Sequence, residues 1–246
     1  MKKIITLGGS NSKNSINKIL AEYSGELIKN VELVKIDLND YNLPMFSIDV
    51  ENEQGFSVDL ITLNNIFDKV DGFVVSLAEH NGAYSTAFKN TFDWLSRING
   101  KVWRDKPMLL LTAAPGARGG ITMLEIALGR FPFMGAKIVG SMSFPFFNEN
   151  FKEGKIVDED LRKQHLELVE TFKKADEILA QLTIEEKINL IGGHNWFFVE
   201  GVDKFGIPKL YLSRKNGKEL YYLLDGGHRT RSIWYYMENK FPISIV

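Results

Sequence analysis

The sequence contains no cysteine. This absence excludes disulfide bonds, thiolate metal sites and a cysteine nucleophile. The sequence also lacks an excess of charge of either sign, because 30 Lys and Arg residues offset 31 Asp and Glu residues and leave a formal net charge of −1. Without a basic excess there is no electrostatic case for nucleic-acid binding. No apolar run approaches the roughly 18 residues that a membrane-spanning helix needs, so we expect no membrane partner.

The N-terminal residues MKKIITLGGS carry a basic pair, but the apolar run after it is short and ends in Gly-Gly. This is typical of a first β-strand rather than of a signal peptide, and we expect a cytoplasmic protein. A chain of 246 residues is long enough for one large domain, or for a domain of about 150–200 residues with a smaller unit.

The stretch that says most about function is residues 4–17, IITLGGSNSKNSIN. An apolar strand runs into Gly8-Gly9-Ser10, a turn rich in Ser and Asn follows, and a helix begins near Ile16. A helix N-terminus presents unpaired N–H groups and partial positive charge, which favour a bound anion. The loop lacks both the G-x-x-x-x-G-K-[ST] and the G-x-G-x-x-G patterns. Its hydroxyl-rich composition favours a monophosphate such as flavin mononucleotide (FMN), and a capped turn with no ligand is the alternative.

Apolar strand-like segments alternate with helical segments over the first 180 residues. The expected strands are residues 3–7, 31–37, 72–77, 108–112 and 137–141, and the expected helices are residues 15–29, 57–69, 84–98, 119–130 and 159–180. This alternation indicates an α/β fold with a doubly wound parallel sheet. With five strands we expect the flavodoxin-like order 2-1-3-4-5 and a ligand beyond the carboxyl ends of the strands.

Three loops lie at those expected strand ends. The first is GGSNSKNSIN, the second is residues 78–84 (AEHNGAY), and the third is residues 112–120 (TAAPGARGG). The glycines of the second and third loops allow backbone N–H groups to come close to a flat ring. Three such loops at neighbouring strand ends predict a single ligand site.

The same loops carry a resemblance to a known family. Residues 9–17 match the pattern G-S-x-R-x-x-S-x-N, residues 78–83 match P-E-Y-N-x-x, residues 87–97 match L-K-N-x-x-D-W-L-S-R, and residues 114–120 match S-x-G-x-x-G-G. On these motifs residues 1–180 resemble the NADPH-dependent FMN reductases, flavodoxin-like enzymes that include quinone, azo-dye and chromate reductases. The match is incomplete, because Ser12 replaces an arginine of many members and Ala78 and His80 replace a proline and a tyrosine.

The resemblance implies an enzyme that passes hydride from NADPH or NADH through bound FMN to a quinone, an azo compound, free flavin or a similar acceptor. The flavin carries this chemistry, so no catalytic side chain and no metal are implied. The residues expected to grip the phosphate are Ser10, Ser12, Ser15, Ile16 and Asn17. Those expected along the ring and ribityl chain are Ala78, Glu79, His80, Asn81 and Gly82. Those expected at the polar edge of the flavin ring are Pro115, Gly116 and Gly119. Arg118 is expected either to attract a phosphate of NADPH or an anionic acceptor, or to lie in solvent as a loop charge without a role.

The resemblance also implies a homodimer or homotetramer, in which a neighbouring subunit often completes the flavin site. Two other functions stay open at this point. One is an FMN-binding electron carrier that does not turn over NAD(P)H, and the other is a nucleotide-binding protein governed by the C-terminal residues.

Residues 181–246 extend beyond the resemblance, and we expect a small α+β appendage there. The expected features are a capping box at Thr183–Glu186, a hairpin of residues 209–213 and 219–224, a helix at 232–237 and a strand at 242–246. The stretch that begins LTIEEK resembles the start of glycoside hydrolase family 3 enzymes. The stretch LLDGGHRTR resembles the DGxHR segment of ParB-like and sulfiredoxin-like domains, with Asp225, His228, Arg229 and Arg231 as candidate phosphate ligands. A docking appendage with a polar turn is the third interpretation.

Overall fold

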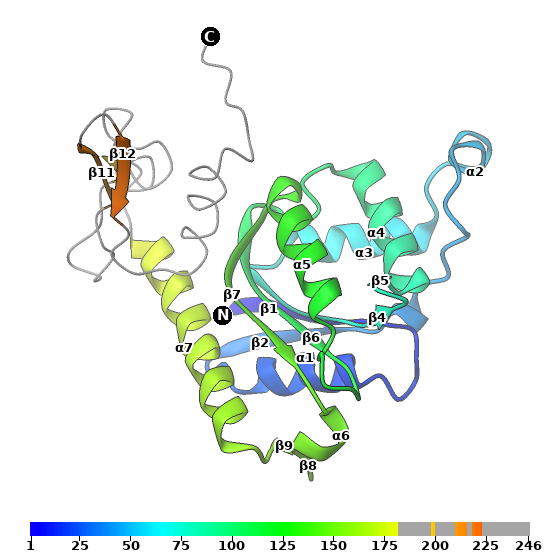
Figure 1. Cartoon of the computed structure of the whole chain (residues 1–246). Coiled ribbons are helices and arrows are strands. Elements are labelled where there is room, and N and C mark those ends of the chain that lie inside the picture. Colours follow the sequence, from blue (N-terminus) through cyan, green and yellow to red (C-terminus); the bar gives the residue numbers. More distant parts are fainter. Residues whose placement is uncertain (182–197, 200–209, 216–217, 223–246) are drawn as a thin grey trace. The chain divides into compact units, whose positions relative to one another are not determined.

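The computed structural model describes residues 1–181, 198–199, 210–215 and 218–222 (Figure 1). The chain divides into two compact units, Met1–Asp176 and Glu177–Val246. The domain division that we predicted after residue 180 falls inside the helix α7 (Glu159–Gln181). None of the described helices combines the length and the apolar character needed to cross a membrane.

A five-stranded parallel sheet forms the centre of the first unit. Its strands are β1 (Lys2–Gly9), β2 (Val31–Ile36), β3 (Gly72–Leu77), β6 (Lys106–Ala113) and β7 (Ala136–Phe144). They lie in the order β2-β1-β3-β6-β7, and every neighbouring pair is parallel. This confirms the flavodoxin-like order predicted from the alternating pattern.

Helices cover both faces of the sheet (Figure 1). The long helices are α1 (Ile16–Glu26), α3 (Val58–Asp68), α4 (Thr86–Ile98), α5 (Ile121–Arg130) and α7. Two separate hydrophobic cores result. One contains apolar residues of α3, α4 and α5, such as Leu63, Phe88 and Met123. The other contains apolar residues of α1 and α7, such as Leu20 and Phe172.

Several short elements were not predicted. They are η1 (Leu38–Asp40), α2 (Ile48–Gln54), η2 (Phe131–Met134), α6 (Phe147–Asn150) and the hairpins β4 (Glu79–His80) with β5 (Ala83–Tyr84) and β8 (Phe151–Lys152) with β9 (Lys155–Ile156). The helix α2 has no buried residue, so it leaves no apolar periodicity in the sequence.

The described part of the second unit contains a small antiparallel sheet. The strands β10 (Phe198–Val199), β11 (Leu210–Lys215) and β12 (Lys218–Tyr222) pair in that order. The pairing of β11 with β12 confirms the predicted hairpin. The predicted capping box at Thr183–Glu186, helix at 232–237, strand at 242–246 and DGGHR segment lie outside the described residues.

Candidate functional site

The loops that follow β1, β3, β6 and β7 leave the sheet at the same level. Gly9 pairs with Leu77, Leu77 with Thr112, and the neighbouring Ala113 with Phe144. In a doubly wound sheet this carboxyl edge is where ligands bind. The three loops singled out from the sequence therefore meet at one edge.

The loop after β1 leads into the N-terminus of α1. Ser15 is the N-cap, and its Oγ accepts a hydrogen bond of 3.2 Å from the backbone N–H of Lys18. Ser10 Oγ accepts one of 3.1 Å from the N–H of Ser12. The N–H groups of the first helical turn have no acceptor within the helix. The donor set here is hydroxyl and amide, which suits a phosphate held by hydrogen bonds.

Gly8 allows α1 to lie directly against the end of β1. A Cβ atom at position 8 would come within 2.6 Å of both Cα and N of Lys18. That separation is shorter than any real Cβ contact, so only glycine fits without a shift of the helix. The strand β1 runs to Gly9, two residues past its predicted end, and the N-terminus of α1 packs against this end of the strand.

Asn17, which we expect to grip the phosphate, has a side chain that bonds to the ends of neighbouring strands. Its Nδ2 donates to the carbonyl of Ala113 (3.0 Å), and its Oδ1 accepts from the N–H of Ala113 (2.8 Å) and from Ser76 Oγ (2.7 Å). The side chain is buried. One amide thus ties the start of α1 to the ends of β3 and β6, and only the backbone N–H of Asn17 is left for a phosphate.

The loop after β3 folds into the β4–β5 hairpin, whose turn has two residues. Asn81 and Gly82 have φ values of 52° and 74°, and positive φ at both central residues is the requirement of a type I′ turn. The hairpin is attached to the first loop, because the hydroxyl of Ser85 donates to the carbonyl of Gly9 (2.8 Å) while capping α4. His80 and Asn81 are exposed at its tip, whereas Ala78 is buried at its base.

Glu79 has a partner that the sequence did not indicate. Its Oε2 accepts a hydrogen bond of 3.1 Å from the N–H of Met123 in the first turn of α5. The N-cap of α5, Gly120, makes no side-chain cap of its own. The carboxylate of Glu79 therefore occupies the α5 terminus, whereas a side chain of the loop itself, Ser15, caps the α1 terminus.

The loop after β6 depends on two left-handed glycines. Gly119 and Gly120 have φ values of 58° and 81°, and a Cβ atom at Gly119 would lie 2.8 Å from the backbone of Phe144 and Pro145. Thr112 Oγ1 donates to the carbonyl of Gly119 (2.8 Å) and fixes the turn. Pro115, Gly116 and Arg118 are exposed, and the Arg118 guanidinium donates to Thr122 Oγ1 (2.9 Å).

The two lysines near the first loop differ in whether they form an ion pair. Lys18 forms an ion pair with Asp37 at the end of β2. The hydrogen bond to Asp37 raises the pKa of Lys18. Burial favours a higher pKa for Asp37, but hydrogen bonds from Lys18 and Asn39 outweigh it and lower that pKa. Lys13, in contrast, is exposed in the loop and forms no ion pair within the described part of the chain. Lys13 is a candidate phosphate-binding residue that was not predicted from the sequence.

The second loop at this edge ends in a tyrosine, Tyr84. The hydroxyl of Tyr84 is buried with no hydrogen-bond partner among the described residues, and burial raises its pKa to about 12. Within the described ranges no group of three or more His, Cys, Asp or Glu residues is placed to hold a metal ion.

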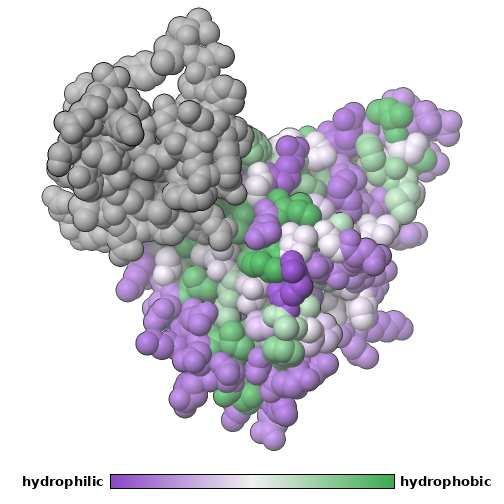
Figure 2. Space-filling view, in the orientation of Figure 1, coloured by the Kyte–Doolittle hydropathy of each residue, from purple (hydrophilic) through white to green (hydrophobic). Residues whose placement is uncertain are grey.

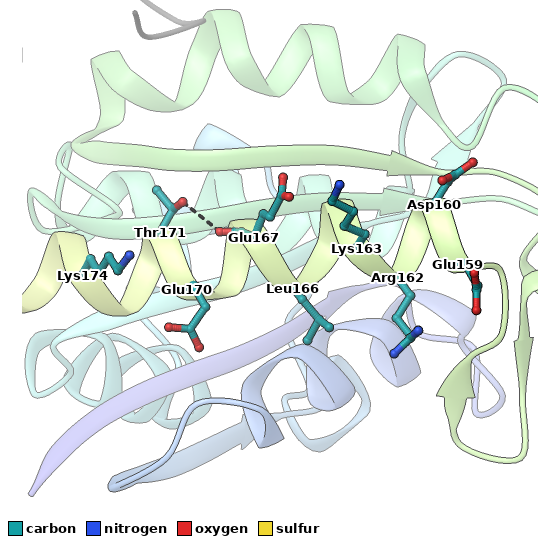
Figure 3. A pocket seen from close by; sticks show the side chains of 9 residues that line it. All are labelled: Glu159, Asp160, Arg162, Lys163, Leu166, Glu167, Glu170, Thr171 and Lys174. Carbon is teal, nitrogen blue, oxygen red and sulfur yellow. Dashed lines mark hydrogen bonds between the residues drawn. The ribbon is translucent and has the colours of Figure 1, made fainter.

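A hollow along α7 is a poor alternative site. Figure 3 shows that its lining side chains come from this one helix and carry both signs of charge, including Glu159, Arg162, Lys163 and Glu170. Thr171 hydrogen-bonds back to the carbonyl of Glu167 in the same helix (2.8 Å). None of the residues from the carboxyl edge of the sheet contributes to it.

The chain is similar to several known proteins. A sequence model described as NADPH-dependent FMN reductase matches residues 2–150. A quinone reductase of Escherichia coli (strain K12) is 30% identical over 118 residues, which span 48% of this chain and 63% of that protein. An NADPH azoreductase of Bacillus sp. (strain OY1-2) is 28% identical over 123 residues, which span 50% of this chain and 65% of that protein. The matched part is thus less than two thirds of either relative.

Among solved structures, the flavoenzyme NAD(P)H:(acceptor) oxidoreductase FerB of Paracoccus denitrificans superposes with a TM-score of 0.60 at 22% identity. The superposition covers 72% of this chain and 98% of that one. It supports the fold of the sheet and its helices.

Proposed function

Because the chain belongs to the NADPH-dependent FMN reductase family, we propose that it is an FMN-dependent oxidoreductase that reduces a quinone, an azo compound or free flavin with NADPH or NADH. The observation that carries the proposal is the hydrogen-bonded junction of Asn17 with Ser76 and Ala113, which ties the start of α1 to the ends of β3 and β6.

The first loop would hold the FMN phosphate. Its donors would be the hydroxyls of Ser10, Ser12 and Ser15 and the backbone N–H groups of Ile16 and Asn17. These groups carry no net charge, so Lys13 and the dipole of α1 would supply the positive potential. Lys13 would then take the place of the arginine that many members carry at position 12.

The second and third loops would hold the flavin ring. The β4–β5 hairpin, with His80, Asn81 and Gly82 at its tip, would lie along the ring and ribityl chain. Pro115, Gly116 and Gly119 would lie at the polar edge. Glu79 would act by fixing the hairpin against α5, and the exposed Arg118 would attract a phosphate of NADPH.

When bound, FMN supplies the two-electron redox chemistry of the reaction. In the overall reaction NAD(P)H loses a hydride and becomes NAD(P)⁺, and a quinone gains two electrons and two protons, the second proton coming from solvent. The chain's own residues bind and orient the reactants. Since NAD(P)H is a cytoplasmic metabolite, we propose a cytoplasmic location, which cell fractionation tests.

An absorbance spectrum tests the proposal directly. Purified protein is expected to be yellow or to become yellow with added FMN, and anaerobic NADPH or NADH is expected to bleach the flavin bands. A protein that stays colourless with FMN present would overturn the proposal. A flavin that binds but is not bleached by either nucleotide would instead make the protein an electron carrier.

We also propose that the protein is a homo-oligomer. Apolar side chains lie exposed on and around α2, namely Met45, Ile48, Phe56, Val58 and Ile61, and Figure 2 shows apolar surface over this projecting segment. Exposed apolar clusters of this kind are typical of subunit interfaces. Light scattering after size exclusion is expected to give a molecular mass that is a multiple of the monomer mass. In Val58→Asp the measured molecular mass is expected to fall toward that of the monomer.

A further inference from the structure

Phe146, in the loop after β7, has an uncommon backbone conformation. Its φ and ψ are 46° and 52°, in the left-handed region. That region is disfavoured for L-residues because Cβ crowds the following carbonyl, and it is rare for bulky side chains. Strained backbone of this kind is often found at ligand sites. The surrounding structure must therefore hold Phe146 in place.

Backbone hydrogen bonds to the third loop hold it. The N–H of Phe146 donates to the carbonyl of Gly116 (3.2 Å), and the N–H of Phe147 donates to the carbonyl of Ala114 (3.1 Å). On the other side, Asn150 Nδ2 donates to the carbonyl of Pro145 (3.0 Å). Phe146 is thus fixed beside the loop that we propose to lie at the polar edge of the flavin.

The ring of Phe146 differs from those of its neighbours in burial. Phe144 and Phe147 are buried in the hydrophobic core shared with α1 and α7, and their rings pack against each other. Phe146 is 45% exposed. Burial therefore accounts for only part of the aromatic side chain at this position, and glycine would satisfy the backbone better.

We propose that Phe146 is a specificity-determining residue that contacts flat aromatic electron acceptors at the carboxyl edge of the sheet. The occupant is the acceptor and not the flavin, because β7 lies outside β6 in the sheet order, one strand further from the first loop. Aromatic rings gain binding free energy by stacking, so the exposed ring favours acceptors with larger flat surfaces. This inference rests on the proposed reductase function.

The test compares Phe146→Asn and Phe146→Tyr with the unchanged protein. Asparagine tolerates the left-handed backbone but lacks the ring, whereas tyrosine keeps the ring. With FMN-loaded protein and NADPH, the Asn variant is expected to raise KM for 1,4-naphthoquinone by roughly fivefold, with a smaller rise for 1,4-benzoquinone and no change in kcat. The Tyr variant is expected to behave as the unchanged protein. Phe133→Asn is the matched control, since Phe133 is an exposed ring in η2, at the other end of β7.

A second readout does not depend on turnover. Titration of the oxidised, FMN-loaded protein with 2-naphthol, followed by the flavin absorbance, is expected to give weaker binding in Phe146→Asn only. Phe146→Gly is expected to raise the melting temperature, because glycine removes the left-handed strain. A naphthoquinone KM and a 2-naphthol affinity that are equal in the Asn variant and the unchanged protein would overturn the inference while leaving the reductase function intact. Absence of FMN binding or NAD(P)H oxidation in the unchanged protein would instead overturn the proposed function, and this inference with it.

Discussion

Asn17 is the residue on which the shape of the site depends most. Its amide satisfies both backbone groups of Ala113 and the hydroxyl of Ser76. In Asn17→Asp the donor to the Ala113 carbonyl is lost and a carboxylate is buried beside that oxygen. We expect a loss of roughly 3 kcal/mol in the free energy of unfolding together with weaker FMN binding, measured by urea denaturation and by flavin titration. Asn14→Asp is the control for the unfolding measurement, because Asn14 is exposed in the same loop. Equal effects of the two substitutions on the free energy of unfolding would contradict the role assigned to Asn17.

Lys13 and Lys18 offer a second comparison between neighbouring residues. Lys13 is exposed and forms no ion pair within residues 1–181, whereas Lys18 is paired with Asp37. If Lys13 compensates the phosphate charge, Lys13→Ala is expected to weaken FMN binding by roughly threefold to fivefold at low salt and less at high salt, where screening is stronger. Lys18→Met is expected to have the smaller effect on FMN affinity. The measurement is the FMN dissociation constant at two ionic strengths, and a larger effect of Lys18→Met would disprove the assignment.

At the scale of elements, α7 is joined to α1 by a buried histidine. His165 lies in α7, is fully buried and stacks on Tyr23 (ring centroids 5.5 Å apart). Ser24 Oγ donates to the carbonyl of Leu20, so His165 Nε2 is the donor in its 2.7 Å hydrogen bond with Ser24. His165 Nδ1 has no hydrogen-bond partner in the part of the chain that the structure describes.

The burial of His165 makes the packing of α7 sensitive to acid. Burial lowers the pKa of His165 from 6.5 to about 4. Below pH 6.5 the unfolded chain therefore binds a proton that the folded protein does not, and stability falls as the pH drops from 6.5 toward 4, by at most roughly 3 kcal/mol. Urea denaturation at pH 7.5 and pH 4.5 measures this loss. His165→Gln is expected to lose less stability between the two pH values, and an unchanged difference would contradict the prediction.

The long elements could be predicted and the short ones could not, for a physical reason. Each main strand and helix buries an apolar face, which leaves a period of two or 3.6 residues in the sequence. The helix α2 buries no residue and leaves no such trace. The β4–β5 hairpin did have a local signal, the Asn81-Gly82 pair. The role of Asn17 had none, because its partner Ala113 is 96 residues away in the chain. The exposure of Phe146 likewise depends on contacts between distant loops.

At the scale of the whole molecule, the candidate site belongs to one unit. Every residue assigned to it lies within Met1–Asp176. A chain that ends at residue 181 is therefore expected to bind FMN and oxidise NADPH as the full chain does. Flavin titration and NADPH oxidation measure this, with circular dichroism as the check on folding. A folded, shortened chain that no longer binds FMN would show that residues 182–246 take part in the site.

The junction at Asn17 has a consequence for how the molecule opens. The N–H of Ala113 is held by a side chain from α1, and the same side chain also holds Ser76 at the end of β3. Solvent reaches this amide when the start of α1 separates from the ends of β3 and β6. Hydrogen exchange at Ala113 should then be as slow as in the centre of the sheet, and a bound ligand at any one of the three loops should slow the opening of all of them.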